Sequence, residues 1–355
     1  MNVPQNHQTA LLIHDIDLSL CTHLYYRYVA INSNASIDSV DAHADIEYGG
    51  LKKFNDLRKK KGSIQIILAV SFSFPATESV NNKLYTDQNL RQKLVNNLVK
   101  YVKKYGFNGI DLDLSYNPQH GGHPSSYKKK YVLLLKAIRE RFHKERLTLS
   151  VAVDPNESTA EILYDIKEIS RYVKFINLKT FEFHLNSDAD KKVGVGHTSP
   201  MYHSPKENTE ERKRNIDYVV RYWIRKGAPE NKLILGTYFS GISYTLANPK
   251  QFGRGSPFTT EGQFGSMMTY FEFCDQIKKW KYFFDHEQKV PYKHKDNQVI
   301  AYDDDRSLEI KAKYVLDMQL GGAMVYSIDA DDFPGKCGKK FALLKTLNRV
   351  LRKKC

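Results

Sequence analysis

The sequence predicts a (β/α)₈ barrel, and three observations lead to that prediction. Short β-rich runs alternate with longer amphipathic helical patterns, which favours a parallel sheet covered by helices. Seven or eight repeats of this alternation follow one another, as a (β/α)₈ barrel requires. The 355 residues are 41% hydrophobic, enough to form one large core, so the length does not demand two domains.

The predicted elements follow one another along most of the chain. The strands are expected at Leu24–Ile31, Ile64–Val70, Gly109–Leu114, Leu147–Val153, Phe175–Phe181, Leu233–Phe239 and Ala323–Ile328. The clearest helical patterns cover Leu90–Tyr105, Tyr127–His143, Ala160–Tyr172 and Arg212–Lys226.

The regular alternation breaks once, where the chain becomes rich in glycine, proline and aromatic residues. We expect an inserted α+β subdomain over residues 241–305, with short antiparallel strands and a helix at Met268–Trp280. The barrel then comprises residues 1–240, and residues 306–355 supply its last strand and helices. An insertion after a barrel strand would form one wall of a cleft on the catalytic face.

The charge of the chain is strongly positive, with 54 Lys and Arg against 40 Asp and Glu, a net +14. Scattered basic clusters such as Lys59-Lys60-Lys61 are usually solvated helix faces; a heparin-type polyanion is the alternative. Nucleic acid is not expected, because no helix-turn-helix, zinc-finger or RNA-stacking motif accompanies the charge. No run of eighteen apolar residues predicts a membrane span.

Four cysteines show no metal-ligand spacing, and no metal or cofactor is expected. They are compatible with one or two disulfides and hence with an oxidising compartment. The sequons at Asn34 and Asn156 agree with secretion, although Ala10–Ile13 is too short for the core of a signal peptide and no export signal is recognised.

Three polar residues stand two apart in one predicted strand. Asp111, Asp113 and Ser115 would therefore share one face of it. Two carboxylates facing a barrel interior are costly in an ordinary core and point to a functional site. The residues alone also allow an alternative, in which the two aspartates lie at the end of the strand and are exposed to water.

This segment, Asn108-Gly109-Ile110-Asp111-Leu112-Asp113-Leu114-Ser115, resembles the Asp-Gly-x-Asp-x-Asp-x-Glu signature of glycoside hydrolase family 18. The resemblance extends from about Asp15 to Leu351, and its nearest likeness is to vertebrate-type chitinases and the chitinase-like lectins. The further matching segments, in chain order, are Cys21–Tyr26, Ile176–Glu182, Asn231–Gly236, Tyr302–Asp304, Leu320–Asp329 and Asp331–Phe333.

In that family the glutamate is the general acid, and the preceding aspartate orients the N-acetyl group of the substrate, which acts as the nucleophile. Ser115 occupies the glutamate position, and a serine hydroxyl cannot protonate a glycosidic oxygen near neutral pH. The loss of a general acid costs about 10²–10⁴-fold in rate. The resemblance therefore implies an inactive, extracellular, monomeric chitinase-like protein in which Asp111, Asp113 and Ser115 are vestigial.

The resemblance also implies a cleft that binds a glycan or a protein receptor. The expected glycan-binding residues are Tyr28, Asp113, Phe181, Glu182 and Tyr326. A hydrolase that uses Glu182 or a rearranged Asp113 as its acid is the rival interpretation.

Several positions depart from the family pattern, and they reduce the expected affinity for chitin. Asn108 replaces the first aspartate of the signature, Lys179 a methionine, and Phe181-Glu182 a Tyr-Asp pair. Ser73, Ser240 and Tyr326 stand where the family has larger or different aromatic residues, each worth about 1 kcal/mol of stacking. Drift after loss of function and a remodelled cleft both remain open. Within the barrel mouth, we expect Lys179 to form an ion pair with Asp113 or Glu182.

The family pattern implies a disulfide between Cys274 and Cys337. The family partner of Cys21 lies in a first barrel strand, for which this sequence leaves only the segment before Asp15. Either Ala10–Ile13 forms a short first strand or that strand is missing. The pairing of Cys21 and Cys355 stays open.

Overall fold

The structure, a computed structural model, describes residues 10–72, 83–113 and 124–352. The chain divides into two compact units. The first comprises Met1–Asp154, Ser158–Asn177 and Lys226–Lys232, and the second comprises Pro155–Glu157, Leu178–Arg225 and Leu233–Cys355. This division does not follow the boundaries predicted at residues 240 and 305, which remain a prediction.

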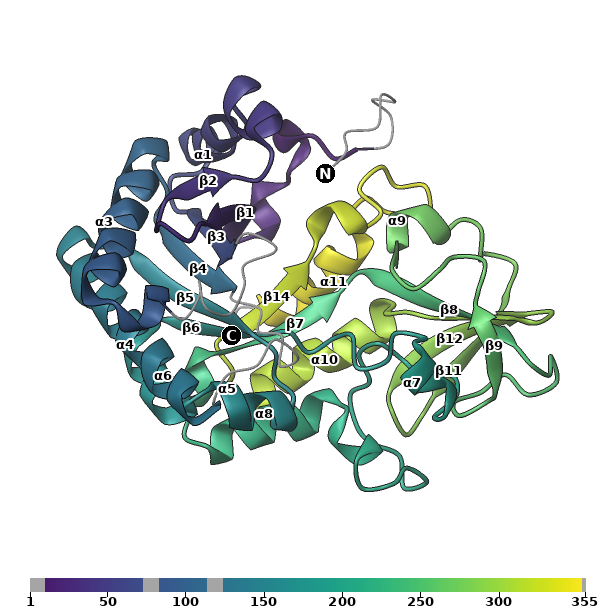
Figure 1. The fold of residues 1–355 in the computed structure, drawn as a ribbon. Helices are drawn as coiled ribbons and strands as arrows, with labels where there is room; N and C mark the ends of the chain where they lie inside the picture. Colours follow the sequence, from purple (N-terminus) through teal and green to yellow (C-terminus); the bar gives the residue numbers. More distant parts are fainter. Residues whose placement is uncertain (1–9, 73–82, 114–123, 353–355) are drawn as a thin grey trace. The chain divides into compact units, whose positions relative to one another are not determined.

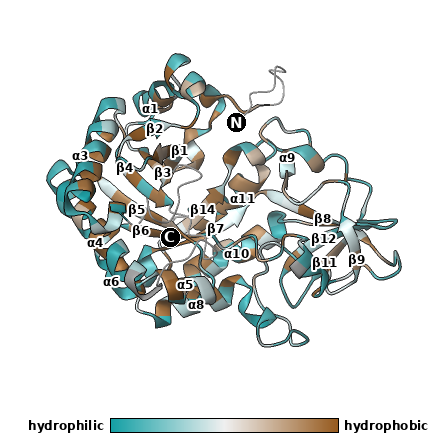
Figure 2. Cartoon of the chain, viewed as in Figure 1, coloured by the Kyte–Doolittle hydropathy of each residue, from teal (hydrophilic) through white to brown (hydrophobic). Residues whose placement is uncertain are grey.

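The first unit is built on a mostly parallel sheet (Figure 1). Its order is β6-β5-β4-β3-β1-β2, with β2 antiparallel to β1 at the edge. Apolar residues dominate β3 and β5, as their hydrophobic colours in Figure 2 show, whereas β4 carries Asp111 and Asp113 between its apolar residues. The strands are β1 (His23–Ile31), β2 (Ile37–Ser39), β3 (Gln65–Phe72), β4 (Gly109–Asp113), β5 (Thr148–Val153) and β6 (Phe175–Leu178).

Amphipathic helices accompany these strands, and α3 illustrates why they form where they do. The Asp87 carboxylate caps its start by accepting the N–H groups of Asn89 and Leu90, and Gly106 ends it in the left-handed conformation, with φ at 82°. The face of α3 that carries Leu94, Leu98 and Val102 is buried. The helices of this part are α1 (Gly50–Lys60), α3 (Gln88–Tyr105), α4 (Pro124–Glu145), α5 (Glu157–Leu163) and α6 (Ile166–Tyr172).

The second unit contains the parallel pair β7 (Leu233–Tyr238) and β14 (Gly322–Tyr326) and a separate antiparallel sheet. That sheet has the order β10-β8-β13-β12-β11, with β9 paired to β8. Its strands are β8 (Ser240–Leu246), β9 (Phe258–Glu261), β10 (Met268–Thr269), β11 (Lys281–Asp285), β12 (Val290–Lys295) and β13 (Gln298–Ala301). Its helices are α7 (Asp188–Lys191), α8 (Ile216–Arg225), α9 (Tyr270–Phe273), α10 (Asp305–Asp317) and α11 (Ala342–Leu351).

The predicted strand and helix alternation is confirmed, but three predicted elements are shorter or broken. Residues 160–172 form two helices, because the Asp165 carboxylate accepts the Glu168 N–H and starts a new helix there. The helix expected at 212–226 begins only at Ile216. The helix expected at 268–280 ends at Phe273, after which hydrogen bonds to the third residue back, such as Lys278 to Asp275, form turns.

The predicted strand at Phe175–Phe181 also ends early, at Leu178. Near the N-terminus, Ala10–Ile13 does not form a strand in the described residues. Instead, Ile13–Asp15 and Leu18–Leu20 are short 3₁₀ helices, and the Asp17 carboxylate caps the second by accepting the Ser19 N–H. Of the two alternatives that the sequence left open, a short first strand at Ala10–Ile13 is therefore not the one seen in the described residues.

A buried ion pair lies in the second unit, where Lys311 of α10 meets Asp303. Their side chains are 0% and 1% exposed, and the Lys311 Nζ lies 2.6 Å from Asp303 Oδ2. The same ammonium donates to Ser199 Oγ at 3.0 Å, and Ser199 Oγ in turn donates to the Thr180 carbonyl at 2.7 Å. The pair is thereby connected to the residue that precedes Phe181.

His197 belongs to the same buried network. Its Nδ1 accepts the Ser199 N–H at 2.9 Å, so its Nε2 carries the proton that is donated to the Tyr302 carbonyl at 2.8 Å. Burial lowers the pKa of His197 to about 4, and the charge of Lys311 acts in the same direction against that of Asp303. The ring is therefore neutral at physiological pH.

Candidate functional site

Asp111 lies at the centre of a polar cluster in the first unit. It is 4% exposed on β4, and its Oδ1 accepts hydrogen bonds from Ser150 Oγ at 2.5 Å and Asn177 Nδ2 at 2.9 Å. Ser150 lies on β5 in register with Asp111, and Asn177 lies on β6. Three consecutive strands thus hold this carboxylate with neutral donors.

The hydroxyl of Tyr25, on β1, belongs to the same cluster. Its burial raises the pKa of Tyr25, and the charge of Asp111 raises it further, whereas hydrogen bonds with Ser150 and Asn177 lower it. The hydroxyl therefore keeps its proton at neutral pH. Tyr25, Ser150 and Asn177 were not among the site residues expected from the sequence, although each lies on a predicted strand.

Asp113 stands beside a cation that the sequence analysis missed. The Arg27 Nη2 lies 3.7 Å from Asp113 Oδ2, and the two side chains are 45% and 12% exposed. The guanidinium also lies 5.5 Å from the centre of the Tyr28 ring. Arg27 and Tyr28 occupy a register shift of β1 against β3, between Tyr26 and Val29, and such irregularities re-aim side chains.

Asn108, which replaces the first aspartate of the signature, holds the starts of two strands. Its Oδ1 accepts the Ile66 N–H at 2.8 Å, and its backbone carbonyl accepts the Thr148 N–H at 2.9 Å. This residue is therefore a structural connection between β3 and β5. The other two departures noted on these strands, Ser73 and Ser115, lie outside the described residues.

Three aromatic rings pack together in the second unit. Phe181 and Tyr238 stack with ring centres 5.1 Å apart, and Tyr326 lies 5.5 Å from Phe181 and 6.1 Å from Tyr238. Tyr238 and Tyr326 are register partners at the ends of β7 and β14. Phe181 and Tyr238 are 6% and 5% exposed, whereas Tyr326 is half-buried. Only Tyr326 keeps appreciable ring surface at this cluster.

Gly236 makes room for this packing. A Cβ at Gly236 would lie 2.4 Å from the Leu178 carbonyl oxygen and 3.0 Å from the Phe181 ring. Tyr238 was not among the site residues expected from the sequence. The signal was present, because Tyr238 lies at the end of the predicted strand Leu233–Phe239 and alternates with Gly236 on one face of it.

Two charged residues at the end of β6 were expected to face the site. Lys179 is half-buried, whereas Glu182 is exposed and has a left-handed backbone, with φ at 63°. Their expected ion pair, and that of Lys179 with Asp113, stay predictions. Of the two sequons, Asn34 is exposed in the turn between β1 and β2, and Asn156 is half-buried.

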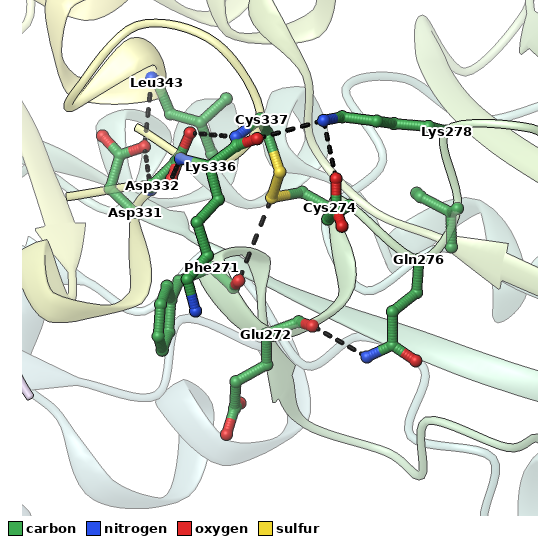
Figure 3. Close-up of a disulfide and its surroundings, with 12 residues drawn as sticks. Phe271, Glu272, Cys274, Gln276, Lys278, Asp331, Asp332, Lys336, Cys337 and Leu343 are labelled. Atoms are coloured by element: carbon green, nitrogen blue, oxygen red, sulfur yellow. Dashed lines mark hydrogen bonds and ion pairs between the residues drawn. A yellow bond between two sulfur atoms is a disulfide. The ribbon is translucent and has the colours of Figure 1, made fainter. Parts of the chain in front are cut away.

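Cys274 and Cys337 form a disulfide in the second unit, with their Cα atoms 6.0 Å apart (Figure 3). Asp332 lies beside it, and its two carboxylate oxygens accept the N–H groups of Lys336 and Cys337, both at 2.7 Å. The three side chains together have the ligand types of a metal site. The sulfurs are bonded to each other, so they offer no thiolate to a metal.

No helix among the described residues is long and apolar enough to cross a membrane.

Comparison with known proteins gives the same family as the sequence motifs. The chain is 32% identical to chitotriosidase-1 of Mus musculus over 95% of its own length and 73% of that protein. It spans 63% of the length of the Manduca sexta endochitinase. Among solved structures, it is similar to the Ostrinia furnacalis Group IV chitinase, with a TM-score of 0.89, 31% identity and coverage of 96% and 94% of the two chains.

It is also similar to human YKL-39, which is described as a pseudo-chitinase with retained chitooligosaccharide binding properties. That structure matches with a TM-score of 0.86 and 27% identity over 98% of this chain and 95% of the other. The family model for glycosyl hydrolases family 18 matches residues 2–331. With strands and helices of a (β/α)₈ barrel and a match that covers most of its length, this chain belongs to glycosyl hydrolase family 18.

Proposed function

We propose that this protein is a secreted, non-hydrolytic member of its family that acts by binding a glycan. The observation that carries the proposal is Ser115, which stands where the family signature has its acidic glutamate. A serine hydroxyl has no acidic proton to give at neutral pH, so the leaving sugar oxygen would depart unprotonated.

The surroundings of the two remaining signature carboxylates support this proposal. Asp111 accepts hydrogen bonds from Ser150 and Asn177, and these strand-borne donors hold it in place. Asp113 lies beside the guanidinium of Arg27. Both remaining signature carboxylates thus already contact donors or a cation of this chain.

The proposed ligand is a chito-oligosaccharide or a related glycan. The likeness to the human pseudo-chitinase, for which retained chitooligosaccharide binding is described, favours this class. We propose that Tyr28, Asp113, Phe181, Glu182 and Tyr326 contact it. Because Phe181 and Tyr238 cover one another, stacking surface at their cluster comes mainly from Tyr326, and we expect affinity below that of an ordinary chitinase.

A hydrolase with a different acid is the second candidate, favoured by the likeness to chitotriosidase-1 and the Group IV chitinase. Glu182 is the alternative acid. Glu182 is an exposed residue, however, and lacks the partly apolar pocket that surrounds a typical catalytic acid.

One experiment separates the two candidates. Purified protein is assayed for hydrolysis of chromogenic chito-oligosaccharides and, in parallel, for chito-oligosaccharide binding by calorimetry. We expect binding without turnover, and about tenfold weaker binding for Tyr326→Ala, since one stacked aromatic is worth about 1 kcal/mol or more. Tyr48→Ala, which removes a tyrosine that is 62% exposed elsewhere, is the matched control. Turnover that Glu182→Gln abolishes would establish the hydrolase instead.

A further inference from the structure

An open depression of about 420 Å³ lies over α1 and the last residue of α3 in the first unit. These two helices are neighbours in the outer layer of the sheet (Figure 1). The depression has no role in the proposed glycan site, whose residues lie on the strands or shortly after the end of β6. Its lining residues are Lys52, Asn55, Asp56, Arg58, Lys59 and Tyr105.

The lining carries three cations and one acid. Lys59 Nζ lies 2.8 Å from Asp56 Oδ1, whereas Lys52 makes no ion pair within the described part of the chain. The hydrogen bond from Lys59 lowers the pKa of Asp56 against the opposing effect of desolvation, and the charges of Lys59 and Lys52 lower it further. Both ammonium groups thus act on a single carboxylate, and the depression keeps an excess of positive charge.

The basic residues around the depression fall into two groups. Arg58 donates to the carbonyl of Gly106, and Lys61 donates to the carbonyls of Leu18 and Cys21, so these two cations hold the ends of elements. Lys53 and Lys60 are exposed on α1. Lys53 and Lys60 extend the positive surface beyond the depression. Neither side chain makes a hydrogen bond or an ion pair with another described residue.

Asn55 adds an unpaired acceptor to the wall. It is 6% exposed, and its Nδ2 donates to the Leu51 carbonyl at 2.9 Å. Because a carbonyl only accepts, this bond fixes the orientation of the amide and leaves Oδ1 without a partner among the described residues. A hydroxyl donor that enters the wall would satisfy it.

We propose that this depression is a second binding site, for an acidic polysaccharide that carries sulfate groups. Sulfates would bind Lys52 and Lys59, and sugar hydroxyls would bind the Asn55 and Tyr105 side chains. A membrane surface is disfavoured, because the exposed apolar residues Val40 and Ile46 do not line the depression. Single-stranded nucleic acid is disfavoured because the one aromatic in the lining, Tyr105, packs its ring against Tyr101 at 4.8 Å.

The test measures binding of the full-length protein to immobilised heparin at several salt concentrations. Lys52→Glu/Lys59→Glu should weaken binding about tenfold or more and lower the salt concentration needed for elution. Lys250→Glu/Lys279→Glu, at exposed lysines of the second unit, makes the same change in net charge and should stay within about twofold. Asp56→Asn, which removes the internal counter-ion, should strengthen binding about twofold to threefold.

Equal losses in the two double variants would show that binding follows diffuse charge and would overturn the site. Binding of N- and O-desulfated heparin as tight as that of heparin would overturn the ligand class. Tighter binding to single-stranded DNA or to anionic phospholipid vesicles would do the same. Chito-oligosaccharide binding should be unchanged in Lys52→Glu/Lys59→Glu, which keeps this inference separate from the proposed function. Melting temperatures verify that each variant is folded.

Discussion

Replacing Lys311 with methionine should lower the free energy of unfolding more than replacing any exposed lysine with methionine does. The ammonium of Lys311 contacts both carboxylate oxygens of Asp303, at 2.7 and 2.6 Å, and both side chains are buried. Methionine keeps most of the aliphatic stem but removes the charge. Among the described residues, the buried Asp303 carboxylate would then keep the hydrogen bond from Ser307 Oγ, at 2.7 Å, as its one remaining side-chain partner.

The expected cost follows from that geometry. Removing one partner of a fully buried ion pair leaves an uncompensated charge and costs about 3–5 kcal/mol, against a typical total stability of about 5–15 kcal/mol. Lys311→Met/Asp303→Leu removes both charges and should recover most of the loss. About 1–2 kcal/mol should remain, because Ser199 and Ser307 each lose a hydrogen-bond partner.

Urea unfolding followed by circular dichroism and fluorescence measures these values. Lys313→Met, on the same helix but 61% exposed and paired with Glu309, is the matched control and should cost less than about 1 kcal/mol. A loss below about 1 kcal/mol for Lys311→Met, or a double variant as unstable as the single one, would refute the reasoning. Because Ser199 connects Lys311 to the Thr180 carbonyl, glycan affinity should fall with stability in Lys311→Met.

Three further predictions concern pH, the disulfide and catalysis. His197, with its pKa lowered to about 4 in the fold, should contribute stability above about pH 6.5 that is lost as pH falls towards 4. That loss amounts to about 3 kcal/mol, and His197→Gln should flatten the pH dependence of unfolding over this range. Cys274 and Cys337 are 63 residues apart, so reduction should cost up to about 4 kcal/mol of unfolding free energy; reduced and oxidised protein with equal urea midpoints would contradict this. Ser115→Glu should not restore hydrolysis of chito-oligosaccharides, because Phe181 and Tyr238 cover one another and leave less aromatic surface to hold the sugar ring in the transition state. Activity within about tenfold of an ordinary chitinase would show that only the acid is missing.

Much of the barrel could be predicted from the sequence. Strand positions such as Leu24–Ile31 and Leu147–Val153 lie within one residue of β1 and β5, because buried parallel strands are short apolar runs between turn signals. The serine at position 115 could also be recognised from the sequence, because the identity of a residue does not depend on the fold. Local signals also mark the start of α3 at Asp87 and its end at Gly106.

Other features depended on individual side-chain contacts that the periodicity of the sequence does not show. The helix predicted at 160–172 breaks because the Asp165 side chain caps a new helix, which competes with the apolar periodicity that spans the break. The pairing of Arg27 with Asp113 depends on an irregularity in the pairing of β1 with β3, which strand periodicity does not encode.

The sequence by itself determined the family, the order of the barrel elements and the absence of a glutamate at position 115. Only the tertiary structure decided which polar groups meet. Asp111 with Asn177, Lys311 with Ser199, and Phe181 with Tyr238 are separated by 66, 112 and 57 residues. Residue type and spacing report on local conformation, whereas the free energy of a buried charge or a stacked ring depends on the partner that the folded chain brings to it.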